Sequence, residues 1–191
     1  AVPGYPRVRL ANLLFLRQPA SVDLYVDEVL RHARLIIIDH LGGESYWPYG
    51  TEQVCELAAA RGIALVMFSG DNVEDELLLR KSTVPRALCQ RLWRYLREGG
   101  AANARAFYDQ IGASFFALPL HAPEPLALPL AGVFHPDGGA DPLARWVSRW
   151  QACAQVRAPA AAPRVAVVFY RAHWQAGNTQ VFEALCEALL A

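Results

Sequence analysis

The stretch LIIIDHLGGESYWPYG, from Leu35 to Gly50, joins a strongly apolar run to a pair of glycines and a group of aromatic residues. Its opening residues, LIIID, form the most apolar short run in the chain. A continuous apolar run of this length is typical of a strand buried on both faces. The adjacent glycines Gly42 and Gly43 follow the strand, and three aromatic residues lie just beyond them. Many nucleotide sites begin with a buried strand that runs into glycines and then a helix, so these glycines either hold a phosphate or only turn the chain.

Helices and a second strand surround this turn. A helix fits residues 48–61, and Gly62 is well placed as its C-terminal stop. The next continuous apolar run, Ile63–Gly70, is predicted to be a strand, and an earlier helix is predicted over Ser21–Ala33 with Ser21 as its cap. Continuous apolar strands separated by helices predict an α/β fold with a parallel sheet covered on both faces, in a Rossmann-like or flavodoxin-like head domain with helical additions.

The second half of the chain begins with two further helices. The first is expected to be capped by Ser82 or Thr83 and to end at Gly99-Gly100, and the second is expected over residues 101–118. A proline-rich connection, a short strand over residues 130–134 and a helix that starts at Asp141 are predicted to follow.

The chain is expected to divide near a linker. Residues 158–163, APAAAP, are typical of a linker, so residues 1–157 are assigned to the head domain. Residues 164–191 begin a second α/β region with a strand over residues 164–170 and a helix that runs to the last residue. A single β-α pair does not bury its own core, which indicates a fragment of something longer.

The composition excludes several classes of protein. The chain has 191 residues, a formal net charge of zero and 54% hydrophobic residues, so it is not disordered and lacks the basic balance of a nucleic-acid binder. Four cysteines lie more than thirty residues apart without zinc spacing, which indicates a reducing, cytoplasmic location and no bound metal. No signal peptide is visible. Four prolines within residues 113–134 exclude a membrane-spanning helix from that weakly charged stretch.

The paired glycines match neither common nucleotide motif. A phosphate loop has the pattern GxxxxGK[ST] and the dinucleotide fingerprint has GxGxxG, whereas Gly42-Gly43 fits neither and the single lysine, Lys81, is distant in sequence. A tight turn is therefore the better interpretation. Tyr46 and Trp47 either pack under the edge of the sheet or line the surface of a flat ligand.

The segment FYRAHWQAGNTQ, residues 169–180, is the best candidate for a binding site. It follows a predicted strand and leads into a helix, and both positions favour anionic ligands in open α/β sheets. The arginine suits a bidentate contact with a carboxylate and the histidine adds a hydrogen bond. The alternative is a loop whose arginine and histidine satisfy nearby carbonyls. The candidate residues of this segment are Arg171, His173, Trp174, Asn178 and Thr179.

Other motifs for chemistry are weak. Histidines with metal-ligand spacing and the nucleophile motif GxSxG are both missing from the sequence. The cluster Asp71, Glu74, Asp75 and Glu76 is interpreted as a solvated loop and helix start, and an acidic metal site is the less favoured alternative. No catalytic residue and no metal ligand is therefore assigned.

Six segments, in this order, resemble a known family. They are RLANLLFLRQPASVDLYVDE, LIIIDHLGGESYWPYG, FSGD, STVP, RLWRYLREGGAANARAFYD and VAVVFYRAHWQAGNTQVFEAL. The combination is similar to the N-terminal part of the large subunits of aerobic cobaltochelatase and of their relative, the H subunit of magnesium chelatase. The forms STVP, EGGAANA and FYRAHWQAGNT favour the cobalt branch.

The resemblance implies ATP-dependent insertion of Co²⁺ into hydrogenobyrinic acid a,c-diamide during aerobic cobalamin synthesis. It implies that the large subunit binds the corrin, while partner subunits with an AAA+ domain hydrolyse ATP with Mg²⁺. The catalytic residues would then lie in regions of the large subunit outside this chain, and no cofactor is expected on the chain itself.

A corrin is an apolar disc edged with carboxylates. Residue type and loop position therefore suggest the segment at residues 171–179 for the rim, and Tyr46 and Trp47 for the face of the ring. Three alternatives stay open: a magnesium chelatase H-like protein that acts on protoporphyrin IX, a docking domain for the ATPase subunits, and a separate flavodoxin-like module for another anion.

Overall fold

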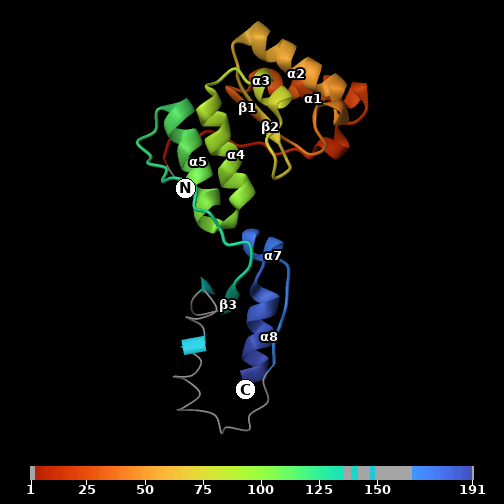
Figure 1. Cartoon of the computed structure of the whole chain (residues 1–191). Helices are drawn as coiled ribbons and strands as arrows, with labels where there is room; N and C mark the ends of the chain where they lie inside the picture. Colours follow the sequence, from red (N-terminus) through yellow and green to blue (C-terminus); the bar gives the residue numbers. More distant parts are fainter. Residues whose placement is uncertain (1–2, 136–138, 142–146, 149–164, 191) are drawn as a thin grey trace. The chain divides into compact units, whose positions relative to one another are not determined.

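The computed structural model describes residues 3–135, 139–141, 147–148 and 165–190. The chain divides into two compact units, each described by itself below. Unit 1 comprises residues 1–98 and 102–126, and unit 2 comprises residues 99–101 and 127–191 (Figure 1).

Unit 1 is built on two parallel strands, β1 (Leu35–His40) and β2 (Ala64–Ser69). Their register runs from Leu35 opposite Ala64 to His40 opposite Ser69. Both strands are the continuous apolar runs of the sequence, and β2 is buried along almost its whole length. The prediction of an α/β fold with a parallel sheet is confirmed, and the described residues of unit 1 contribute two strands to it.

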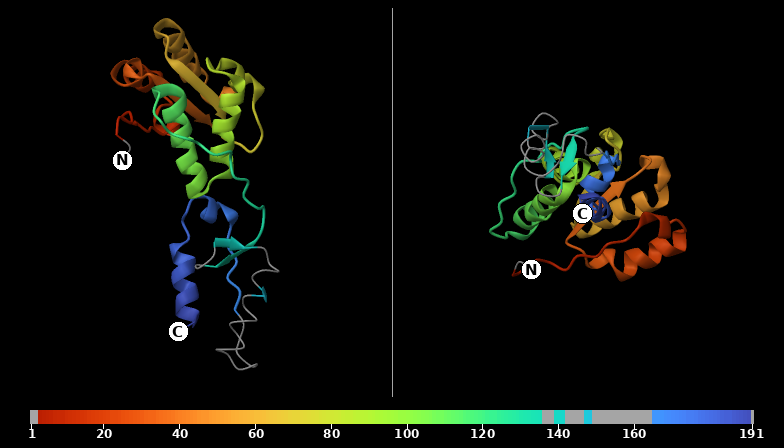
Figure 2. Two further views of the ribbon diagram at one scale, coloured as in Figure 1. Left: turned by 90° about the vertical axis from the view of Figure 1, so that its left-hand side faces the viewer. Right: turned by 90° about the horizontal axis from the view of Figure 1, so that it is seen from below.

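Helices cover both faces of this sheet. Helices α1 (Pro19–Glu28) and α2 (Pro48–Arg61) pack on the face that carries Ile36, Ile38 and Leu65. Helices α4 (Arg86–Glu98) and α5 (Gly100–Phe116) lie side by side and pack on the face of Val66 and Phe68 (Figures 1 and 2). The short helix α3 (Glu76–Lys81) contributes Leu78 to the first core and Leu79 to the second. Short 3-10 helices are η1 (Leu13–Phe15), η2 (Leu30–His32) and η3 (Glu44–Tyr46).

The ends of the helices agree with the sequence in one case and differ in another. Helix α2 has the expected bounds and stops at Gly62, whose φ of 65° is the left-handed conformation that glycine favours. Helix α1 begins at Pro19 after Gln18, so the prediction of Ser21 as its cap is wrong. Proline is well suited to the first turn of a helix because it has no N–H that would stay unpaired there. The helix therefore begins at Pro19, before Ser21 in the sequence.

Ser82 and Thr83 do not cap α4, which begins at Arg86. Instead, the Thr83 and Ser82 hydroxyls accept hydrogen bonds from the backbone N–H groups of Leu65 and Met67, both at 2.8 Å. The N–H of Thr83 also donates to the Leu65 carbonyl at 2.9 Å. These groups take the place of a neighbouring strand along the free edge of β2, which would otherwise expose unpaired backbone.

Unit 2 differs most from the sequence prediction. Strand β3 (Val133–His135) pairs antiparallel with β4 (Gly139–Asp141), and the described residues 165–190 include the helices α7 (Arg171–Gln175) and α8 (Gln180–Leu190). Residues 165–170 were expected to be a strand, but they form none, and Val168 is 92% exposed. A strand needs a partner for its backbone hydrogen bonds, and the described residues supply none here.

The expected domain boundary stays a prediction. Its linker, residues 158–163, lies outside the described residues, as does nearly all of the helix that was expected to start at Asp141. The predicted start itself is wrong, because Asp141 is the last residue of β4, where it pairs with Val133. In the described part of the chain, no helix is long and apolar enough to cross a membrane.

Candidate functional site

The carboxyl ends of β1 and β2 meet at one edge of the unit 1 sheet, the place where open α/β sheets bind ligands. Gly42 and Gly43 follow β1 with φ angles of 89° and 73°, which only glycine adopts readily. Gly70 follows β2, and its N–H donates to the His40 carbonyl at 2.9 Å. A Cβ atom at Gly70 would lie 2.9 Å from the backbone nitrogen of Leu41. The glycines at this edge therefore serve the turn and the close passage of two chain segments.

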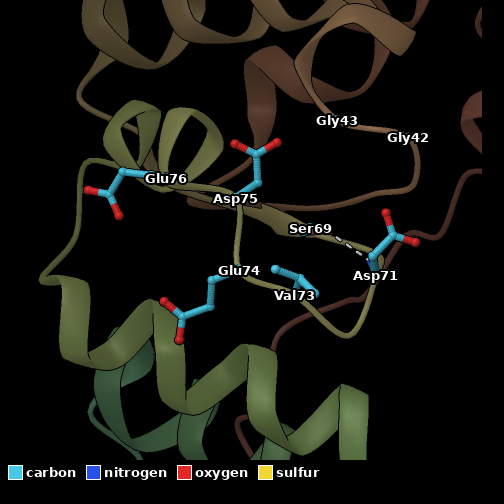
Figure 3. A pocket seen from close by; sticks show the side chains of 8 residues that line it. All are labelled: Gly42, Gly43, Ser69, Asp71, Val73, Glu74, Asp75 and Glu76. Atoms are coloured by element: carbon cyan, nitrogen blue, oxygen red, sulfur yellow. Dashed lines mark hydrogen bonds between the residues drawn. The ribbon is translucent and has the colours of Figure 1, made fainter.

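An open pocket of about 350 Å³ lies at this edge (Figure 3). The loop between β2 and α3 forms one wall, and the glycine turn forms the other. Its lining residues are Gly42, Gly43, Ser69, Asp71, Val73, Glu74, Asp75 and Glu76. Four of these eight are acidic, so the pocket presents carboxylates to whatever enters it.

Three of the four carboxylates already have partners. Asp75 caps α3, and its Oδ1 accepts from the N–H groups of Leu77 and Leu78 at 2.9 and 3.2 Å. Glu76 accepts from Arg86 at 2.6 Å, and Glu74 accepts from Gln90 at 2.8 Å. These contacts fix the loop and the start of α3, as the interpretation of a solvated loop and helix start implies.

The charge of the pocket makes it unsuitable for phosphate or carboxylate ligands. A Cβ placed on Gly43 would lie 3.3 Å from Oδ2 of Asp75, so the turn faces a carboxylate directly. An anion there would meet like charge at short range, which is strongly unfavourable outside bulk water. Within the described ranges, no group of three or more histidine, cysteine, aspartate or glutamate side chains is arranged to hold a metal ion.

His40, the last residue of β1, is a buried polar residue that the sequence analysis did not single out. Its side chain is completely buried, and within the described part of the chain neither ring nitrogen has a hydrogen-bond partner. The rings of Tyr46 and Trp47 pack against it at centroid distances of 5.9 and 6.5 Å. Burial lowers the pKa of His40, against the opposing effect of the Asp75 and Asp39 carboxylates. The signal in the sequence was a histidine directly at the end of an apolar strand.

We expect His40 to make unit 1 less stable in mild acid. The unfolded chain binds a proton near the ordinary histidine pKa of about 6.5, whereas folded His40, with its lowered pKa, stays neutral. The free energy of unfolding therefore falls as the pH drops below about 6.5, with a slope of at most about 1.4 kcal/mol per pH unit, until the folded imidazole also protonates. Urea unfolding of the wild type and of His40→Phe between pH 5 and 8 isolates this slope, because all other groups cancel in the difference.

Exposed His121 supplies the control for this prediction. The variant His121→Gln, which removes an exposed histidine ring, is measured in the same way, and its slope is compared with that of His40→Phe. A His40→Phe variant with an unchanged slope would contradict the assignment to His40.

Asp39 precedes His40 on β1 and forms an ion pair with Arg97. Oδ2 of Asp39 and Nη2 of Arg97 are 2.5 Å apart. Burial raises the pKa of the Asp39 carboxyl, although the adjacent Arg97 guanidinium pulls the pKa down. The pair joins β1 to α4 and was not predicted, because the two residues are 58 positions apart in the sequence.

Tyr46 and Trp47, the two residues predicted to lie against the face of the ring, have different environments in the structure. Trp47 is 5% exposed, and its indole Nε1 donates to the Leu16 carbonyl at 2.6 Å, so it packs in the core as the first of the two interpretations had it. Tyr46 is 42% exposed, and its ring also packs against Gly42 and His40. Of these two residues, only Tyr46 therefore has a ring that is accessible to a ligand.

The predicted rim residues lie together in unit 2, but on a short helix and the following turn. Arg171 opens α7, and its Nε and Nη2 donate to the carbonyls of Pro129 and Leu128 at 2.9 and 3.1 Å. The His173 ring contacts Phe182 edge to face at 5.3 Å. The Thr179 hydroxyl donates to Glu183 at 2.6 Å at the start of α8. The expected loop is thus a helix, and these contacts follow the interpretation in which the arginine satisfies nearby carbonyls.

Comparisons with known proteins agree with one another. Residues 93–191 match the sequence model of the family described as CobN/Magnesium Chelatase. The chain is 42% identical over 187 residues, 98% of its length, to an aerobic cobaltochelatase subunit CobN of Pseudomonas aeruginosa. It is 38% identical over 186 residues, 96% of its length, to a protein of the same name from Sinorhizobium sp.

A solved structure is also similar. The catalytic subunit of cobaltochelatase from Mycobacterium tuberculosis matches 87% of this chain with a TM-score of 0.62 and 29% sequence identity. The match covers 12% of that structure, and the chain spans 14% of the length of each curated relative.

Proposed function

The chain belongs to the CobN/magnesium chelatase family, and we propose that it forms the N-terminal head of the large subunit of an ATP-dependent cobaltochelatase. The proposed reaction is the insertion of Co²⁺ into hydrogenobyrinic acid a,c-diamide in the cytoplasm, during aerobic cobalamin synthesis. The observation that carries the proposal is the 42% identity to a cobaltochelatase subunit along 98% of this chain.

The chemical steps are assigned to other parts of the complex. Metal insertion requires groups that remove the pyrrole protons and groups that strip water from the cation, and we assign neither to the described residues. We propose that these groups lie in the remaining polypeptide of the large subunit, and that partner subunits with an AAA+ domain hydrolyse ATP with Mg²⁺. The acidic pocket beside Gly42 and Gly43 supports a head that does not bind ATP, since it would repel the phosphates.

For the head itself we propose contact with the tetrapyrrole, and each unit, taken by itself, offers a candidate group of residues. In unit 2, Arg171, His173, Trp174, Asn178 and Thr179 would meet the carboxylates at the rim, where charge-assisted hydrogen bonds are strongest. In unit 1, Tyr46 would lie against the ring, whereas Trp47 would act indirectly by holding η3 and the start of α2.

A tetrapyrrole titration of the 191-residue chain tests this role. The five tryptophans provide an intrinsic fluorescence signal that a bound corrin or porphyrin quenches. Saturable binding that prefers the a,c-diamide corrin would support the cobalt assignment. A preference for protoporphyrin IX would support the magnesium relative, which belongs to the same family.

Substituting Arg171→Ala is expected to weaken corrin binding by about tenfold or more. A hydrogen bond to a charged group contributes about 1.5–3 kcal/mol, and the alanine removes every donor of the guanidinium. The dissociation constant of each variant is measured by the same fluorescence titration, after circular dichroism has verified the fold. Arg105→Ala, an exposed arginine on α5, is the control and should bind as the wild type does. An Arg171→Ala variant that folds and binds with unchanged affinity would remove Arg171 from the rim.

A docking role for the ATPase subunits is the second candidate. The hydrogen bonds of Arg171 to the Leu128 and Pro129 carbonyls favour it, because a guanidinium engaged in the fold is less available to a ligand. This role predicts a stable complex with the ATPase subunits and no quenching by either tetrapyrrole.

A further inference from the structure

The 3-10 helix η1 carries large apolar side chains that point into solvent. Phe15 is 80% exposed and Leu14 is 54% exposed, and Leu10, five residues before Phe15, is 86% exposed. Single exposed apolar residues are common on protein surfaces, but an exposed phenylalanine and two exposed leucines within six residues of sequence are typical of an interaction surface.

This segment is held rigidly by the core of unit 1. Leu16 is buried, Leu13 packs against the same core, and the Leu16 carbonyl accepts the buried indole N–H of Trp47 at 2.6 Å. Asn12 caps η1, since its Oδ1 accepts from the N–H of Leu14 at 3.0 Å. Leu14 and Phe15 are therefore displayed on a fixed turn, so little conformational entropy is lost when a partner covers them.

The same N-terminal stretch of sequence also carries basic side chains. Arg7, Arg9 and Arg17 are all exposed, and none has an acidic partner in the part of the chain that the structure describes. Arginine and aromatic residues are the types most enriched at protein interfaces, and arginine favours carboxylates through paired hydrogen bonds. This N-terminal segment therefore matches a partner that offers both apolar and acidic groups.

The shape of the surface favours a protein partner over a tetrapyrrole. Small ligands bind in concave sites that bury most of their surface, whereas side chains that are 80–86% exposed stand out from the molecule. A projecting phenylalanine fits a hollow on another folded surface, as interface anchors do.

We propose that Leu10, Leu14, Phe15 and the three arginines form a docking surface for an acidic region of the remaining polypeptide of the same large subunit. This inference rests on the proposed function, because the remaining polypeptide exists only if the chain is part of such a subunit. The length of the relatives argues for this occupant, since the match covers 14% of each and most of the subunit lies outside it. The charge of the three arginines argues for acidic groups on the covering region.

The test compares one cysteine in two contexts. Phe15→Cys is introduced into the 191-residue chain and into the intact large subunit that contains it, and the rate of maleimide modification is followed by mass spectrometry on the peptide with residue 15. We expect this rate to be at least tenfold lower in the intact subunit. Ala60→Cys, at an exposed position near the end of α2, is the control. The change in its modification rate between the 191-residue chain and the intact subunit is used to normalise the rate at residue 15.

A charge reversal tests the acidic partner. Arg7→Glu, Arg9→Glu and Arg17→Glu, combined in the intact Phe15→Cys subunit, should restore the modification rate to within about threefold of the free chain. A matched triple reversal at other exposed arginines, Arg61, Arg94 and Arg105, should leave the protection in place.

Other outcomes overturn the inference. Equal modification rates in the two contexts would mean that nothing in the subunit covers the surface. Protection that arises only after the ATPase subunits are added would assign the surface to a different protein. Neither readout involves a tetrapyrrole, so a subunit that protects residue 15 but binds no corrin would refute the proposed tetrapyrrole contact of the head and leave the docking surface standing.

Discussion

An alanine at Gly50 is expected to lower the free energy of unfolding by about 3 kcal/mol. A Cβ atom at this position would lie 1.9 Å from Cε2 of Trp47 and 2.1 Å from Cζ2, far inside van der Waals contact. The indole is buried and hydrogen-bonded to the Leu16 carbonyl, so it cannot move aside without a loss of packing or of this hydrogen bond. Overpacking costs about 1–3 kcal/mol and a lost buried hydrogen bond about 1–3 kcal/mol, while alanine returns about 1 kcal/mol of helix propensity.

Urea unfolding followed by circular dichroism measures this effect, and Gly62→Ala is the matched control. Gly62 ends the same helix with a φ of 65°, and a methyl group at this position would have no other atom within 4 Å. Its substitution therefore carries only the conformational cost of about 1–2 kcal/mol. If Gly50→Ala is no more destabilising than Gly62→Ala, the indole yields more easily than its buried position implies. The comparison also tests whether Trp47 is a packing residue.

The elements that sequence patterns predicted well are those defined by local chemistry. Strands β1 and β2 follow from continuous apolar runs, and α2 follows from the interval between them and from Gly62. Ser82 and Thr83 show the limit of this reasoning. A hydroxyl before a helix usually indicates a cap. Here the same hydroxyl oxygens accept hydrogen bonds from backbone N–H groups of β2 instead, because buried strand N–H groups without a partner are costly.

The remaining differences arise from contacts between distant residues. Residues 165–170 have the composition of a strand, yet a strand forms only where another supplies hydrogen-bond partners, and no local pattern reports that. Tyr46 and Trp47 are equally aromatic neighbours in sequence, but the Leu16 carbonyl, 31 residues from Trp47, decides which one is buried. The burial of His40 at the end of β1 was not predicted either, because it depends on the rings of Tyr46 and Trp47, which pack against the imidazole.

The second large effect is expected at Tyr95, the largest fully buried side chain in unit 1. Tyr95→Ala should lower the free energy of unfolding by about 4 kcal/mol, since removal of a buried aromatic ring leaves a cavity between α4, α5 and β2. The ring also holds the proline-rich connection, because its hydroxyl donates to the Pro123 carbonyl. Urea unfolding monitored by circular dichroism gives the size of the effect.

Tyr95→Phe separates the ring from its hydroxyl and should cost only about 1 kcal/mol. The Pro123 carbonyl keeps a second donor in Arg91, whose Nη2 lies 3.2 Å away, and the same guanidinium pairs with Glu124 at 2.8 Å. Proline cannot donate a backbone hydrogen bond, so a connection rich in proline depends on side chains such as Tyr95, Arg91 and Asn103 to hold its carbonyls. If Tyr95→Phe proves as costly as Tyr95→Ala, the hydroxyl rather than the packing of the ring anchors this connection to unit 1.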